Sequence, residues 1–202
     1  MKKLIALLLS LVLLTLALTG CGETMKAESS VNGMFKAFKE LNIAEAQKYV
    51  NVEDIKNAGS ESDKDSDETS EMFFEFIFGN LSHEIVSSEK VDNKTVLVKT
   101  KITAVDMKPV LGEFFKEYLA YAFSAAFSDP QPTEEEQTKK MEEIFAECTS
   151  DPDLKTITTE VDIKVVKAAD NKWKIEADDT FVNAMLGGFV EAMEELGDSF
   201  SS

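Results

Sequence analysis

The chain has 202 residues and a formal net charge of -17 at pH 7, and all 21 of its basic residues are lysines. The planar guanidinium of arginine is the usual group for binding phosphate or guanine, so its absence and the acidic charge argue against a nucleic-acid-binding protein. The length is typical of one domain with a real core.

The N-terminus predicts where the protein resides. Residues 4–18 form an uncharged apolar run that follows two lysines. A signal peptide has this pattern, whereas a membrane-spanning helix needs about 20 apolar residues. The run ends in four residues that resemble a bacterial lipobox, Leu18, Thr19, Gly20 and Cys21. We therefore expect residues 1–20 to be a lipoprotein signal peptide and Cys21 to carry the lipid, with an ordinary secretory peptide as the alternative.

Two acyl chains on Cys21 would anchor the protein stably, because each buried methylene adds roughly 0.8 kcal/mol. The chain would then lie on the extracytoplasmic face of the cell membrane, and its membrane contact would be the lipid anchor. Removal of residues 1–20 takes away two lysines and changes the formal charge from -17 to -19.

Acylation of Cys21 leaves one thiol, Cys148, so no internal disulfide is expected. The helical spacing of Cys148 from Ile144 favours a buried apolar role over a nucleophile.

The first part of the mature chain is predicted to be a tether followed by helices. Residues 21–30 lack apolar periodicity and indicate a lipidated, flexible tether. Apolar residues then recur at three- and four-residue steps in 31–41 and 43–50, which predicts two helices.

Residues 57–71 are small, polar or acidic and predict a mobile loop. The alternating Asp63, Asp65 and Asp67 resemble a calcium-binding loop. However, Glu68 and Phe74 occupy the positions where such a loop has glycine and glutamate, so we expect no metal site.

The remaining chain alternates between strand and helix patterns. Strands are predicted at 83–91, 94–105, 157–165 and 173–177, from alternation of apolar and polar residues. Helices are predicted at 71–81, at 107–127 after the capping residue Asp106, from the Thr133–Glu136 capping box to Cys148, and after Asp179 or Thr180. The apolar stripe of the 107–127 helix is expected to be buried, and Gly187 and Gly188 to mark a break or a close helix contact.

These elements predict an α+β fold. We expect a single domain over residues 31–202, with a curved antiparallel sheet of about four strands packed against several helices. The two helices between the strand pairs form an insertion.

Three segments carry a resemblance to a family: WKIEADDTFVNAMLGG (173–188), FKAFKELNIAEAQKYV (35–50) and ITAVDM (102–107). They resemble uncharacterised lipoproteins of low-GC Gram-positive bacteria, which are similar to domains with the nuclear-transport-factor-2-like, or cystatin-like, fold. The resemblance implies helices resting in a curved sheet, with a cone between them that can hold a ligand. It implies no catalytic residues and no cofactor.

The function that these features favour is a non-catalytic binding or scaffolding module. Its ligand would be a small apolar molecule or an envelope protein, and the candidate pocket or partner surface comprises Phe114, Tyr118, Phe123 and Trp173. A first alternative is partner binding or self-association through the phenylalanine-rich segments 72–78 and 114–127. A second is an isomerase- or dehydratase-like enzyme.

The materials for catalysis are poor. His83 is the only histidine, and it lies at the start of a predicted strand without a visible partner. Asp106 and Tyr118 could reach a pocket, but each has a structural role that accounts for its presence. Asp106 can cap a helix, and Tyr118 belongs to the apolar stripe of that helix.

Overall fold

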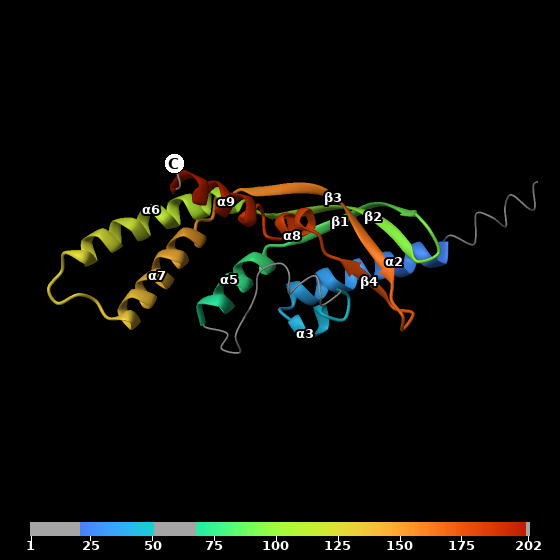
Figure 1. Ribbon diagram of the computed structural model, residues 1–202, viewed down its shortest axis with the longest axis horizontal. Coiled ribbons are helices and arrows are strands. Elements are labelled where there is room, and N and C mark those ends of the chain that lie inside the picture. Colours follow the sequence, from blue (N-terminus) through green and yellow to red (C-terminus); the bar gives the residue numbers. More distant parts are fainter. Residues whose placement is uncertain (1–20, 51–67, 201–202) are drawn as a thin grey trace, which may run out of the picture. The chain divides into compact units, whose positions relative to one another are not determined.

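The computed structural model describes residues 21–50 and 68–200 (Figure 1). The predicted signal peptide and the aspartates of the predicted acidic loop lie outside these residues. The elements in chain order are α2 (Cys21–Lys39), α3 (Ile43–Ala46), α5 (Glu68–Gly79), β1 (Ser82–Lys90), β2 (Thr95–Val105), α6 (Met107–Ala126), α7 (Glu134–Thr149), β3 (Thr156–Lys167), β4 (Trp173–Glu176), α8 (Asp179–Met185) and α9 (Phe189–Phe200).

The predicted α+β class is confirmed. The four strands form one open antiparallel sheet in the order β1-β2-β3-β4. In the β3–β4 hairpin Val165 lies opposite Ile175 and Lys167 opposite Trp173. The strand boundaries are close to those predicted, because alternation of apolar and polar residues reports directly which face of a strand is buried.

The described chain divides into two compact units. Unit 1 comprises residues 21–50, 83–101 and 160–181, and unit 2 comprises residues 68–82, 102–159 and 182–200. Strands β2 and β3 run through both units, so neither unit is a separate stretch of sequence.

The core of unit 1 is a sheet face covered by helix α2, which packs on β4. Val31 and Met34 of α2 are completely buried, as are alternate residues of the strands. The buried strand residues are Val96, Val98, Thr100, Val161, Ile163, Val165, Trp173 and Ile175. The space between helix and sheet, where the predicted cone would open, is therefore filled by side chains in unit 1.

Helix α2 begins ten residues earlier than predicted, so the tether assigned to residues 21–30 is helical. Ala27 and Val31 are fully buried, and the Ser30 hydroxyl donates to the Trp173 carbonyl at 2.8 Å. Glu28 accepts a hydrogen bond from Ser88 of β1 at 2.7 Å. These contacts come from residues far along the chain, so tertiary packing orders a segment whose own composition indicates coil.

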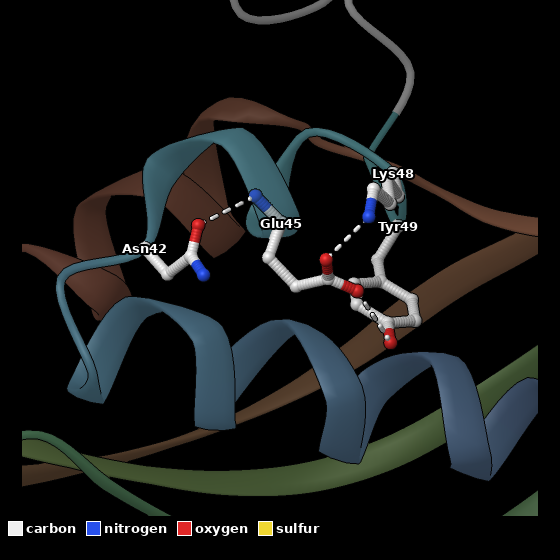
Figure 2. A network of polar contacts seen from close by, with 4 residues as sticks. All are labelled: Asn42, Glu45, Lys48 and Tyr49. Atoms are coloured by element: carbon white, nitrogen blue, oxygen red, sulfur yellow. Dashed lines mark hydrogen bonds and ion pairs between the residues drawn. The ribbon is translucent and has the colours of Figure 1, made fainter.

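Helix α3 is a single turn, shorter than the predicted 43–50 helix, and a local polar network surrounds it (Figure 2). Asn42 caps the turn by accepting from the Glu45 backbone N–H at 3.0 Å. Glu45 also accepts from the Lys48 ammonium and from the Tyr49 hydroxyl. After the turn, the Tyr49 carbonyl accepts from the Ile175 N–H at 2.7 Å, which joins the segment to β4.

In unit 2 helices α6 and α7 lie side by side as a hairpin (Figure 1). Both predicted N-terminal caps are confirmed. Asp106 accepts from the Lys108 N–H at 3.2 Å, and Thr133 and Glu136 form a reciprocal capping box. The last predicted helix is divided at Gly187 and Gly188 into α8 and α9. Asp178 caps α8 by accepting from the Phe181 N–H at 2.8 Å, whereas the predicted cap was Asp179 or Thr180.

The apolar stripe of α6 is buried only in its first part, which differs from the prediction. Met107, Val110 and Leu111 are buried, whereas Phe123 and Phe127 are 72% and 77% exposed. Helical periodicity shows that residues share a face but does not show where along its length that face is covered.

Candidate functional site

Unit 2 contains an apolar cavity of about 370 Å³ among four of its helices. The ten lining residues are Phe73 and Phe74 of α5, Val110, Leu111, Phe114 and Phe115 of α6, Met141 and Phe145 of α7, and Phe189 and Met193 of α9. All ten side chains are apolar, and six are phenylalanines. The cavity therefore offers an apolar ligand a surface and offers a polar group no partner.

Ring contacts show how the helices build this wall. Phe73 of α5 lies with ring centroids 6.0 Å from Phe145 of α7 and 5.2 Å from Phe189 of α9. Phe145 also meets Phe114 of α6 at 6.3 Å with the ring planes nearly perpendicular. Edge-to-face pairs, here Phe73–Phe189 and Phe145–Phe114, add roughly 0.5–1.5 kcal/mol each beyond the burial of the rings. The rings thus hold the four helices around the cavity.

The structure separates the four residues predicted as a pocket or partner surface. Phe114 lines the cavity, and Tyr118 stacks on Phe114 with centroids 6.1 Å apart. Phe123 lies beyond the cavity and is 72% exposed. Trp173 is a core residue of β4 in unit 1 and is not among the residues that line the cavity.

Sequence reasoning missed most of the cavity because its residues are distant along the chain. Phe73, Phe145 and Phe189 come from three separate helices, and nothing in their local patterns indicates that they converge. The predicted helical insertion contributes six of the ten lining residues, through α6 and α7. The cavity therefore lies among helices, whereas the predicted cone lay between helices and the sheet.

Cys148 of α7 is half-buried in unit 2. Burial raises the pKa of its thiol, and the carboxylates of Glu113, Glu117 and Glu147 raise that pKa further. A higher pKa leaves less thiolate, which is the reactive form. This environment is the opposite of the one that activates a nucleophilic cysteine.

His83 has partners in unit 1, in contrast to the sequence-based expectation. Its Nε2 lies 2.8 Å from Asn32 Oδ1, and its ring stacks on Phe35 with centroids 4.0 Å apart. Burial lowers the pKa of His83 from its usual value of 6.5. The ring thus packs α2 against β1.

We expect the stability of the protein to fall as the pH decreases below 6.5. The pKa of His83 is lower in the folded protein than in the unfolded chain, so protonation favours the unfolded chain. This contribution is fully present above the unfolded pKa and is lost as the pH falls through the folded pKa. Urea unfolding between about pH 8 and about pH 5 measures it, and a His83→Gln variant should show a shallower pH dependence. Equal pH dependence in the two proteins would contradict the assignment to His83.

Within residues 21–50 and 68–200, no group of three or more histidine, cysteine, aspartate or glutamate side chains is arranged to hold a metal ion. In the same ranges, no helix has both the length and the apolar character needed to cross a membrane.

The profile of the family described as "Domain of unknown function (DUF5105)" matches residues 55–190 of the chain. The chain belongs to this family. The matched range includes every residue that lines the cavity except Met193. The DUF5105 region therefore carries nearly the whole candidate site.

Comparison with solved structures gives a further likeness, to a candidate lipoprotein (ycdA) from Bacillus subtilis subsp. subtilis str. 168. The two chains are 15% identical with a TM-score of 0.44, and the match covers 72% of this chain and 49% of the other. The match thus spans about half the length of that protein. Comparison with curated proteins gives no match.

Proposed function

We propose that this DUF5105 protein is a lipid-anchored binding protein of the extracytoplasmic membrane face, and that the cavity in unit 2 binds an apolar ligand without catalysing a reaction. The observation that carries the proposal is the cavity wall of ten apolar side chains contributed by four helices.

The size and chemistry of the cavity support an apolar ligand. Ligand cavities commonly measure about 300–1,000 Å³ and combine an apolar wall with a few polar groups that orient the ligand. Here the wall has no polar side chain. A hydrocarbon or aromatic group fits this wall, and any polar part of the ligand would stay outside it, because a buried polar group without a partner costs free energy.

The same wall supports binding in preference to catalysis. None of its side chains titrates, so it holds no acid, base or nucleophile. The groups considered for catalysis lie elsewhere in their units: His83 packs on Phe35, and Asp106 caps α6.

Lipidation of Cys21 and a nuclear-transport-factor-2-like fold are parts of the same proposal. The uncharged run and the lipobox-like residues 18–21 support the first, and helix α2 on an antiparallel sheet supports the second. Labelled palmitate should enter the wild-type protein and not a Cys21→Ala variant. A wild-type protein without label would contradict the anchor.

We expect the unlipidated mature chain, made as Cys21→Ser, to bind the neutral probe N-phenyl-1-naphthylamine with increased fluorescence. A Phe74→Gln/Met193→Gln variant should bind it at least about tenfold more weakly, because two rim side chains lose apolar area and gain polar amides. Phe74 and Met193 are 42% and 39% exposed, so the fold should tolerate both changes.

The matched control is Leu119→Gln/Phe123→Gln, which changes two exposed side chains of α6 beyond the cavity. This control should bind the probe as the parent chain does. Equal weakening in both variants, or no binding by the parent chain, would contradict a ligand site in the cavity.

A further inference from the structure

The end of helix α6 presents an exposed apolar line. Leu119, Phe123 and Phe127 are 51%, 72% and 77% exposed. Leu119 and Phe123 are four residues apart and lie on one face of the helix. Phe127 directly follows the last helical residue, and its ring lies with its centroid 5.1 Å from that of Phe123. We refer to these three residues as the α6 tip.

Exposure of this kind has a cost in water. A large aromatic ring buries about 150–250 Å² when it is covered, and this area drives association with any apolar phase. Among the described residues, two other large apolar side chains are more than half exposed, Met25 at 66% and Val91 at 56%. Both are single residues in unit 1. The α6 tip differs because its residues adjoin.

The sequence around the α6 tip is also unusual in charge. Residues 119–133 contain one charged side chain, Asp129, in a chain of which 29% is charged. Acidic residues begin again immediately on both sides, with Glu117 before the segment and Glu134 after it. A largely apolar segment with a single charged side chain is thus set in a strongly acidic protein.

We propose that the α6 tip inserts into the interfacial region of a lipid bilayer. Exposed aromatic rings at the end of a helix are suited to the boundary between headgroups and acyl chains. The driving force is burial of apolar area, because a mature chain with a formal charge of -19 is not attracted to anionic headgroups.

Charge disfavours a second copy as the occupant of this surface. Two copies would each bring a mature formal charge of -19 to the pair, and like charges oppose association. A bilayer of zwitterionic lipids carries no net charge and imposes no such repulsion.

The presence of a membrane near the tip rests on the proposed lipid anchor, which would keep the protein at the membrane surface. The membrane contact proposed for the tip itself is reversible. Its effect on binding is nevertheless measurable without the lipid, so its test is independent of lipidation.

The test measures co-sedimentation of the unlipidated Cys21→Ser mature chain with phosphatidylcholine vesicles. We expect the parent chain to bind, and each of Phe123→Ser and Phe127→Ser to lower the partition coefficient on the order of tenfold. Addition of phosphatidylglycerol at low salt should weaken binding, and added salt should restore it, which is opposite to the behaviour of a basic membrane-binding patch.

The matched control is Met25→Ser/Val91→Ser, which removes exposed apolar side chains from unit 1 and should leave vesicle binding unchanged. Thermal unfolding of each variant verifies that the fold is retained. Absence of vesicle binding by the parent chain would overturn the proposal, as would equal losses in tip and control variants. A concentration-dependent dimer, lost in the tip variants and formed in place of vesicle binding, would assign the surface to a second copy.

Binding of N-phenyl-1-naphthylamine distinguishes this proposal from that for the cavity. Tip variants should lose vesicle binding and retain probe binding. If the protein binds vesicles through the tip but does not bind the probe, membrane insertion of the tip is supported. Only the proposed ligand site in the cavity is then contradicted.

Discussion

Replacement of Gly187 by alanine is expected to lower the free energy of unfolding by at least about 3 kcal/mol. Gly187 has a φ of +58°, which side-chain-bearing residues adopt only with strain, and an added Cβ would lie 1.8 Å from the Val105 carbonyl oxygen. That oxygen is backbone at the end of β2 and cannot rotate away. Relief of the clash requires α8 and α9 to move away from β2, which would also break the 2.9 Å bond from the Met107 N–H to the Gly187 carbonyl.

Gly188 supplies a matched control for this change. Its φ is +80°, but no atom lies within 4 Å of the position of an added Cβ. Gly188→Ala should therefore show only the conformational cost of about 1–2 kcal/mol. Urea unfolding of both variants separates the steric clash from the backbone strain. Equal destabilisation by the two alanines would contradict the close approach of Gly187 to β2.

Gly187→Ala should also weaken binding of the apolar probe in any population that remains folded. Phe189 lines the cavity and begins α9 two residues after Gly187. Movement of this turn displaces one wall of the cavity. Gly188→Ala, which requires no such movement, should bind the probe more tightly than Gly187→Ala.

Trp173→Ala is expected to lower the free energy of unfolding by about 3–5 kcal/mol, because it removes a large side chain from a core. Trp173 is 5% exposed in β4, the strand on which α2 packs. The loss combines the transfer free energy of the indole with the cost of the cavity that remains. Trp173→Phe keeps an aromatic ring at this position and should cost less.

Circular dichroism must be used to follow this unfolding, since Trp173 is the only tryptophan and its fluorescence disappears with it. A destabilisation by Trp173→Ala below about 1 kcal/mol, within the range of ordinary surface changes, would contradict its place in the core. Unchanged probe binding by the folded variant would agree with the location of Trp173 in unit 1 and its absence from the residues that line the cavity.

The parts of the fold that could be predicted are those determined by neighbouring residues. The Thr133–Glu136 capping box and the Asp106 cap each need only a few residues of sequence, and both are present. The β3–β4 hairpin follows from alternation on either side of a short turn, where Asn171 adopts a φ of 63°. These signals are local, so the rest of the fold does not change them.

The parts that could not be predicted depend on contacts between distant residues. Residues 21–30 lack an apolar pattern of their own, and their helix is stabilised by bonds such as that from Ser30 to the Trp173 carbonyl. The cavity forms because α5, α7 and α9 bring Phe73, Phe145 and Phe189 together. Phe114 and Phe123 both lie in α6, but the apolar pattern of this helix does not indicate that Phe123 remains exposed.

The start of helix α2 at Cys21 has a mechanical consequence. A flexible linker after a lipidated cysteine would let the domain change its orientation relative to the bilayer. A helix that begins at that cysteine leaves no flexible linker residues between the two. Under the proposed lipidation, helix α2 would couple the orientation of unit 1 to that of the lipidated residue. Gly-Ser residues inserted directly after Cys21 would then free the rotation of unit 1, and fluorescence anisotropy of membrane-bound protein would register the faster motion.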